Sequence, residues 1–199
     1  MKKLLFRSCV STVMLLATVV MYVSNAGAQT PFQSKSVTIS LTGTSSLHDW
    51  EMKAGQGKSE GAFTIDANHK ITAISKLNFS LPAKSLKSEH TMMDNNTYKA
   101  LNTDKNPTIS FVLTSGTVTS TSNNNYQLHC FGKLTIAGTT KETDLIATGI
   151  YNPADKSFTV TGVKAMKMTD YNVKPPTVMM GTIKTGNDIS IAYNVKFTQ

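Results

Sequence analysis

The stretch DISIAYNVKFTQ, residues 188–199, alternates apolar and polar side chains. Apolar residues stand at every second position from Ile189 to Phe197, and polar residues such as Asn194 and Lys196 stand between them. A period of two is typical of a β-strand that buries one face and leaves the other in water. The segment therefore predicts a half-buried strand near the C-terminus.

The same period recurs along most of the chain. It predicts further strands over residues 37–41, 63–65, 71–81, 109–113, 126–136, 145–151 and 158–162. Turn-forming residues separate these segments, as in Asp66–His69 and Asn152–Asp155. Many short strands in one domain predict an antiparallel sheet that forms either a sandwich or a closed barrel. A barrel of about eight strands would have room for one small ligand.

One segment departs from this pattern. Met93, Thr97 and Leu101 recur at the spacing of a helix, and Asp94 lies where a helix start favours negative charge. Asn102 and then Pro107 follow as stop signals. We therefore expect one short helix of about ten residues between strands.

The N-terminal segment has the layout of a secretory signal peptide. Lys2, Lys3 and Arg7 form a basic start, an apolar stretch runs over residues 9–23, and small residues end at Ala28. This layout predicts a signal peptide over residues 1–28, with cleavage before Gln29. We interpret residues 29–36 as a loose polar leader and residues 37–199 as a single domain.

Composition limits the function. The chain has 20 basic and 12 acidic residues, and three of the basic residues fall in the predicted signal peptide. The remaining chain has no arginine and no run of lysines, which argues against nucleic-acid binding. Cys130 is its only cysteine, so an intramolecular disulfide is excluded. No later apolar run approaches the roughly 20 residues of a membrane-spanning helix, so we expect a soluble mature protein.

The residues that could support catalysis do not form a recognisable motif. A Gly-x-Ser-x-Gly elbow is missing, and no pair of histidines has metal-ligand spacing. We therefore expect no enzyme, no metal and no cofactor. An enzyme that uses His48 or His129 as a base remains a third hypothesis. Cys130 is interpreted as a small core side chain.

Three clusters combine methionine and aromatic residues. Trp50 follows His48, the predicted helix with Met92, Met93 and Tyr98 leads to Phe111, and a third cluster holds Met166, Met168 and Tyr171. Methionine adapts to irregular apolar surfaces, so these residues either fill a core or line a site for a long apolar ligand. Nearby lysines could flank the mouth of such a site: Lys84, Lys87, Lys99, Lys105, Lys174 and Lys184.

Taken in order, four segments make the chain resemble the YceI-like family of secreted bacterial proteins. They are residues 43–50, 86–111, 132–141 and 168–191. The commoner family pattern has an Arg-Asp pair ahead of a Phe-Phe pair at the helix. This chain has Met93-Asp94 and, later, Tyr98-Lys99-Ala100-Leu101.

The resemblance implies an all-β fold, an eight-stranded antiparallel lipocalin-like β-barrel with a short helical insertion. It further implies a periplasmic carrier that holds a polyisoprenoid, or a similar long-chain or quinone-like amphiphile, without catalysis. We expect the ligand to be lined by Trp50, Met92, Met93, Tyr98, Phe111, Met166, Met168 and Tyr171. His48 and Asp94 are the candidates for head-group contacts.

The rival hypothesis is a ligand-free secreted module with a structural or stress-response role. A solid core would favour this module, and an internal cavity would favour the carrier. The sequence leaves open whether two barrels pair as a homodimer and whether the protein leaves the periplasm.

Overall fold

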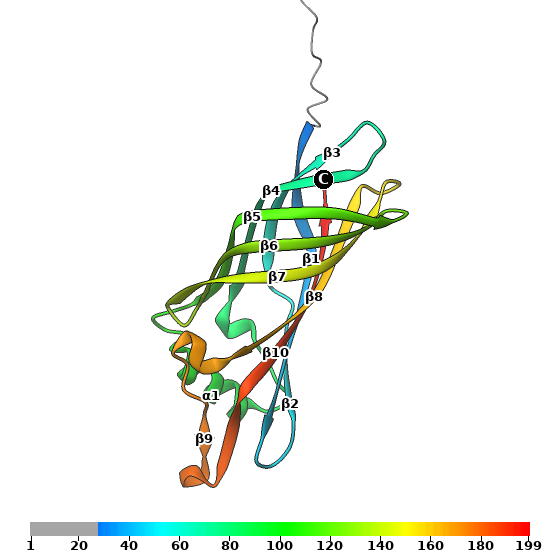
Figure 1. Cartoon of the computed structure of the whole chain (residues 1–199). Helices are drawn as coiled ribbons and strands as arrows, with labels where there is room; N and C mark the ends of the chain where they lie inside the picture. Colours follow the sequence, from blue (N-terminus) through cyan, green and yellow to red (C-terminus); the bar gives the residue numbers. More distant parts are fainter. Residues whose placement is uncertain (1–27) are drawn as a thin grey trace, which may run out of the picture.

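The computed structural model describes residues 28–199 (Figure 1). The predicted signal peptide, except for Ala28, lies outside the described residues. The described part consists of β1 (Ala28–Ser45), β2 (Trp50–Ala54), β3 (Lys58–Ile65), β4 (Ile71–Pro82), η1 (Ala83–Ser85), α1 (Thr91–Leu101), β5 (Thr108–Ser122), β6 (Asn125–Ile136), β7 (Thr139–Asn152), β8 (Ser157–Lys167), η2 (Met168–Tyr171), β9 (Thr177–Val178), η3 (Met179–Gly181) and β10 (Ile183–Thr198). No helix in this part is both long and apolar enough to cross a bilayer.

Eight of the strands form a closed ring. Neighbours follow in the order β1-β3-β4-β5-β6-β7-β8-β10, and β10 pairs with β1 to close it. The pairings are antiparallel, and β2 and β9 attach to β1 and β10 outside the ring. The predicted eight-stranded antiparallel barrel with one short helix is confirmed. Because the ring lies within residues 28–199, the predicted mature chain retains the barrel.

The first strand begins earlier than the sequence pattern predicts. Residues 28–33 pair with β3, and from Gln33 onward β1 pairs with β10. The interpretation of residues 29–36 as a loose leader is therefore wrong. Most of their polar side chains face water, but Phe32 points inward and is buried. The hydrogen bonds that hold this segment come from distant strands, so local composition does not reveal them.

The strand pairing changes at the end of the barrel that carries α1 (Figure 1). There β1 exchanges β3 for β2 as its neighbour, and the segment Gly55–Gly57 separates these two strands. β2 is linked to the segment before α1 by an isolated bridge between Lys53 and Lys87. The predicted helix is confirmed as Thr91–Leu101, and it ends at Asn102, whose φ of 49° is left-handed. The helical insertion thus lies beside the end of the barrel at which β1 pairs with β2.

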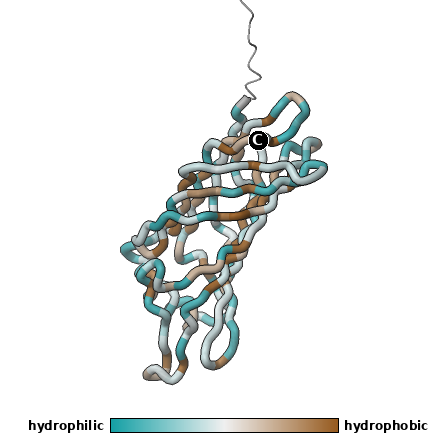
Figure 2. The backbone as a smooth tube through the Cα atoms, in the orientation of Figure 1, coloured by the Kyte–Doolittle hydropathy of each residue, from teal (hydrophilic) through white to brown (hydrophobic). Residues whose placement is uncertain are grey.

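The opposite end of the barrel is filled by aromatic rings. The Phe63 ring lies edge-on to Phe32, Phe158 and Phe197, with centroids 5.3, 5.1 and 5.9 Å away. Phe158 also packs edge-on against Tyr126. We call this group, completed by Tyr151, the aromatic cap. Figure 2 shows hydrophobic and hydrophilic positions alternating along the strands that carry it.

Truncating the aromatic cap should destabilise the protein strongly. Phe158 is completely buried, so Phe158→Ala should lower the free energy of unfolding by about 3–5 kcal/mol. Val163→Ala is the matched control, because Val163 lies on the same strand with 63% of its surface exposed. Its cost should stay within about 0.5 kcal/mol. Chemical denaturation of both variants measures the difference, and equal stabilities would contradict a packed cap.

Candidate functional site

Beyond the aromatic cap the barrel encloses an inner cavity. Its volume is about 220 Å³. One water needs about 10–15 Å³, so the space far exceeds an ordinary packing defect. Inward-facing residues from the strands line it, together with residues of α1 and η2: among them are Ile39, Leu41, Met52, Leu77, Phe79, Leu81, Leu101, Leu134, Leu145, Ile191 and Val195.

The wall of the inner cavity offers almost no free polar atoms. Ser59 is buried there, and its hydroxyl donates to the Asn78 carbonyl at 2.9 Å. The Tyr193 hydroxyl donates to the carbonyl of Ile146 at 3.0 Å, and burial raises the pKa of Tyr193 to about 12. Within residues 28–199 no buried side-chain nitrogen or oxygen lacks a hydrogen-bond partner. The cavity is therefore suited to an apolar chain rather than to a polar metabolite.

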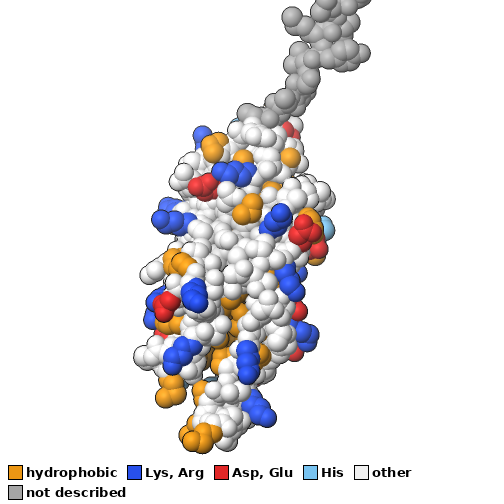
Figure 3. Space-filling view, turned by 90° about the vertical axis from the view of Figure 1, so that its left-hand side faces the viewer, with side chains coloured by type: hydrophobic (Ala, Val, Ile, Leu, Met, Phe, Trp, Pro, Cys, Tyr) orange, Lys and Arg blue, Asp and Glu red, His pale blue; other side chains and the backbone are white. Residues whose placement is uncertain are grey.

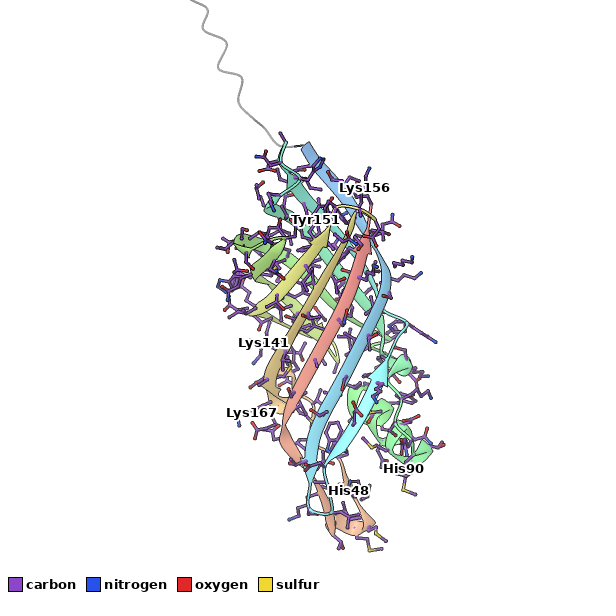
Figure 4. All side chains as sticks on the ribbon, turned by 90° about the vertical axis from the view of Figure 1, so that its right-hand side faces the viewer. His48, His90, Lys141, Tyr151, Lys156 and Lys167 are labelled. Carbon is purple, nitrogen blue, oxygen red and sulfur yellow. The ribbon has the colours of Figure 1, made fainter. Side chains whose placement is uncertain are left out.

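A second space, the outer hollow, adjoins the cavity at the end that carries α1. Its volume is about 230 Å³, and it shares Trp50, Thr97, Met168 and Pro176 with the cavity wall. The β1–β2 turn, the start of α1 and the β9–β10 hairpin surround it. Figure 4 shows His48 and His90, which line this hollow, at the same end of the molecule. Cavity and hollow together form an apolar interior with a more polar outer part.

The structure brings most of the predicted site residues to these two spaces. The inner cavity is lined by Trp50, Phe111, Met166, Met168 and Tyr171. The outer hollow is lined by Met92, Met93 and His48, and Trp50 and Met168 face both spaces. Tyr98 and Asp94 line neither of them. Their predicted contacts with a ligand therefore have no support in the geometry.

Trp50 owes its position to a glycine on the neighbouring strand. Gly43 on β1 pairs with Trp50 on β2, and a β-carbon at Gly43 would collide with the indole ring. The indole nitrogen donates to the Thr44 carbonyl at 2.9 Å. The ring is thus held across the strand pair at the boundary between the cavity and the hollow.

Tyr98 and Asp94 fasten the helix to the segment that precedes it. The Tyr98 hydroxyl lies 2.9 Å from the carbonyl oxygens of both Lys84 and Leu86. The Asp94 carboxylate accepts hydrogen bonds from the backbone and hydroxyl of Ser88, at 2.7 and 2.8 Å, and pairs with Lys87. The rotation of α1 about its axis turns both side chains towards residues 84–88. The sequence pattern does not specify this rotation.

Sequence reasoning missed the largest part of the cavity wall. Met52 is buried and lines the cavity, and its sulfur accepts a hydrogen bond from the Thr97 hydroxyl. The aliphatic residues of the wall occupy every second position of the strands, so the alternation already identified them as inward-facing. What the alternation does not distinguish is an inward residue in a packed core from one that borders empty space.

The wall has a seam between β7 and β8. These strands pair only over residues 147–152 and 157–162, and they separate beyond that point. Side chains bind the carbonyls of β7 there: Lys164 donates to Asp144 at 2.9 Å, and Tyr193 donates to Ile146. Lys164 and Lys167 both border the cavity. Lys167 pairs with Asp188, whereas Lys164 contacts only a neutral carbonyl.

The residues of the enzyme hypothesis do not converge. The Cys130 thiol is buried, and burial raises its pKa to about 11, which makes it a poor nucleophile at neutral pH. His129 lies outside the barrel and contacts the Asp144 carboxylate at 2.8 Å. His48 is at the opposite end, in the β1–β2 turn. Among residues 28–199 no three histidine, cysteine or acidic side chains gather as metal ligands.

Fold and site define a closed antiparallel β-barrel with an apolar interior. The chain belongs to the YceI-like family, because the YceI-like domain matches residues 22–197. Curated proteins provide no match.

Several solved structures share the fold. Burkholderia cenocepacia BcnA is 17% identical with a TM-score of 0.63, covering 80% of this chain and 95% of BcnA. A polyisoprenoid-binding domain from Saccharophagus degradans, implicated in plant cell wall breakdown, is 8% identical with a TM-score of 0.58 and covers 84% and 97%. The Campylobacter jejuni YceI protein is 18% identical with a TM-score of 0.52 and covers 71% and 82%. At these identities the likeness establishes the fold.

The anchoring role of Asp94 predicts a pH-dependent stability. Burial raises the pKa of its carboxyl, but the Ser88 hydrogen bonds and the Lys87 ammonium outweigh this and hold the pKa below the ordinary 3.8. A carboxyl of this kind contributes stability fully above its ordinary pKa, and the contribution is lost as the pH falls through the folded-state pKa. Asp94→Asn should lower the free energy of unfolding by about 1 kcal/mol at pH 7.

The deficit of Asp94→Asn should shrink in acid, where the wild-type carboxylate becomes protonated. Denaturation of both proteins between pH 7 and pH 3 measures this. Glu60→Gln is the control, because Glu60 forms an exposed ion pair with Lys76 and should change stability by less than about 1 kcal/mol. A deficit that is independent of pH would contradict the proposed anchoring by charge.

Proposed function

We propose that the protein is an exported lipid-binding barrel. It holds a polyisoprenoid or a similar long-chain amphiphile in the inner cavity and either carries or sequesters it, without catalysis. The predicted signal peptide supports export, and the resemblance to secreted bacterial proteins supports the periplasm as the site of this function. Membership of the YceI-like family supports the proposal, as does the shared fold of the polyisoprenoid-binding domain from Saccharophagus degradans.

The observation that carries the proposal is the apolar inner cavity. A ligand-free module would be stabilised by filling this volume, because an empty cavity costs about 24 cal/mol per Å³ in a protein core. The barrel instead keeps a cavity of about 220 Å³, which is lined mainly by aliphatic and aromatic side chains. Apolar surface buried there contributes roughly 25 cal/mol per Å² to affinity without any directional bond. A flexible hydrocarbon chain matches this site best.

The outer hollow provides for the polar end of the amphiphile. His48 and His90 line it, and Trp50 separates it from the inner cavity. Imidazole groups donate or accept hydrogen bonds, so they suit a head group such as a quinone, an alcohol or a phosphate. The chain would then lie inward, with its end near the aromatic cap.

The direct test is native mass spectrometry of the processed protein, residues 29–199, purified gently from exported material. We expect a stoichiometric adduct that solvent extraction releases as a lipid of isoprenoid mass. An unloaded protein that also takes up no added polyprenyl lipid or quinone would overturn the proposal in favour of the ligand-free module.

A substitution that fills the cavity should abolish binding without unfolding the barrel. Ile191 borders the inner cavity, so Ile191→Trp should reduce lipid uptake at least about tenfold. Asn194→Trp is the matched control, because Asn194 is exposed on the same strand. Uptake is measured by native mass spectrometry after thermal melting shows that both variants fold. Equal uptake by both variants would place the ligand outside the cavity.

A further inference from the structure

The rim of the outer hollow carries exposed apolar side chains. Leu47, Met92 and Met179 are 66%, 72% and 72% exposed, and Met180 is fully exposed. Three separate elements present them: the β1–β2 turn, the first turn of α1 and the β9–β10 hairpin. Large apolar residues that gather at one end of a protein mark an interaction site.

The two methionines of the hairpin lie at its tip. Met179 and Met180 form η3 with positive φ angles of 51° and 56°, the backbone of a tight turn. Figure 1 shows this hairpin at the end farthest from the C-terminus, and Figure 3 shows hydrophobic side chains at that end. Flexible thioether side chains on a projecting tip have no core to fill and can enter a soft apolar phase.

The other exposed large apolar residues of the described part are placed differently. Val112, Ile146, Ile150 and Val163 lie on the strands of the barrel wall, away from the outer hollow. By contrast, Leu47 and Met92 line the outer hollow, and Met179 and Met180 directly follow Val178, which also lines it. Their position therefore links them to the mouth of the site.

Charge favours an anionic partner for this end. The Lys174 and Lys184 ammonium groups are exposed near the rim and form no ion pair within residues 28–199. Asp49 and Glu89 oppose them locally, but the chain as a whole carries a net charge of +8, of which five charges remain beyond the predicted signal peptide. Figure 3 shows lysines around the lower half of the visible face. Basic residues next to an apolar tip favour an anionic lipid surface.

We propose that the rim of the outer hollow docks onto an anionic phospholipid bilayer, with Leu47, Met92, Met179 and Met180 inserted among the lipids. Separate projections around an opening suit a fluid phase better than a flat protein partner, because each side chain can enter the lipid independently. Docking brings the mouth of the cavity to the bilayer, so an apolar chain can transfer without crossing water. The inference goes beyond the proposed function and shares only the mouth with it.

The experiment measures co-sedimentation of the processed protein, residues 29–199, with vesicles. One set contains phosphatidylethanolamine with phosphatidylglycerol, and the other contains phosphatidylcholine alone. We expect binding to the anionic vesicles that weakens as salt rises. The double variant Met179→Ser, Met180→Ser should lose at least about fivefold in partitioning. The matched control is Val112→Thr, Ile150→Thr, which removes exposed apolar groups from the wall and should bind as the wild type does.

Three results would overturn the proposal. They are no sedimentation of the wild type, binding that the tip variant retains, and equal loss in the wall variant. Sedimentation velocity tests whether a second copy of the chain occupies the rim instead. If the wild type forms an oligomer but does not bind vesicles, and the Met179→Ser, Met180→Ser variant is monomeric, the rim is a dimer interface. Vesicle binding is measured on protein without added ligand, and lipid uptake is measured without vesicles. The two assays are independent, so the docking proposal and the proposed function can fail separately.

Discussion

Pairing between the first and the last strand is the constraint on which the rest of the structure depends. β1 and β10 pair from Gln33 opposite Thr198 to Ser45 opposite Thr185, with a register shift near each end, and this contact turns an open sheet into a ring. Closure pairs the backbone hydrogen-bonding groups of both outer strands, and it does so without a disulfide. Along its length β1 also exchanges β3 for β2 as its neighbour, at the end that carries α1. Met52 and Trp50 of β2 line the cavity there.

The two ends of the barrel divide stability and function between them. The aromatic cap packs six rings, including the completely buried Phe63 and Phe158, into the end opposite α1. Large aromatic side chains bury the most area per residue, so this end can stabilise a fold whose other end is hollow. At the end that carries α1, Trp50 and several methionines line the inner cavity and the outer hollow. A cavity there costs stability that the cap offsets.

The sequence predicted the parts of the structure that local periodicity encodes. The alternation over β10, the helix at 91–101 and its stop at Asn102 all appear in the structure. The start of β1 was missed because residues 29–36 owe their strand conformation to β3 and β10, which are distant in sequence. Met52 was missed because the direction of a side chain on a short strand depends on tertiary packing. Tyr98 and Asp94, which were expected at the ligand, line neither space because the rotation of α1 about its axis also depends on packing. Composition identified the right clusters, but only the fold determines which side chains border space.

The seam between β7 and β8 shows how a barrel can stay closed where its ladder is incomplete. Residues 139–146 of β7 have no partner on β8, and Lys164 and Tyr193 donate to the carbonyls of Asp144 and Ile146 instead. Asn172, which follows η2, adds a bond to the Thr139 hydroxyl at 3.1 Å. Each side-chain bond contributes about 0.5–1.5 kcal/mol, and a few of them replace a continuous ladder. The seam is therefore a part of the wall where side chains supply hydrogen bonds that the strand ladder lacks. Because Lys164 and Tyr193 also line the inner cavity, the seam lies beside the space where a ligand would lie.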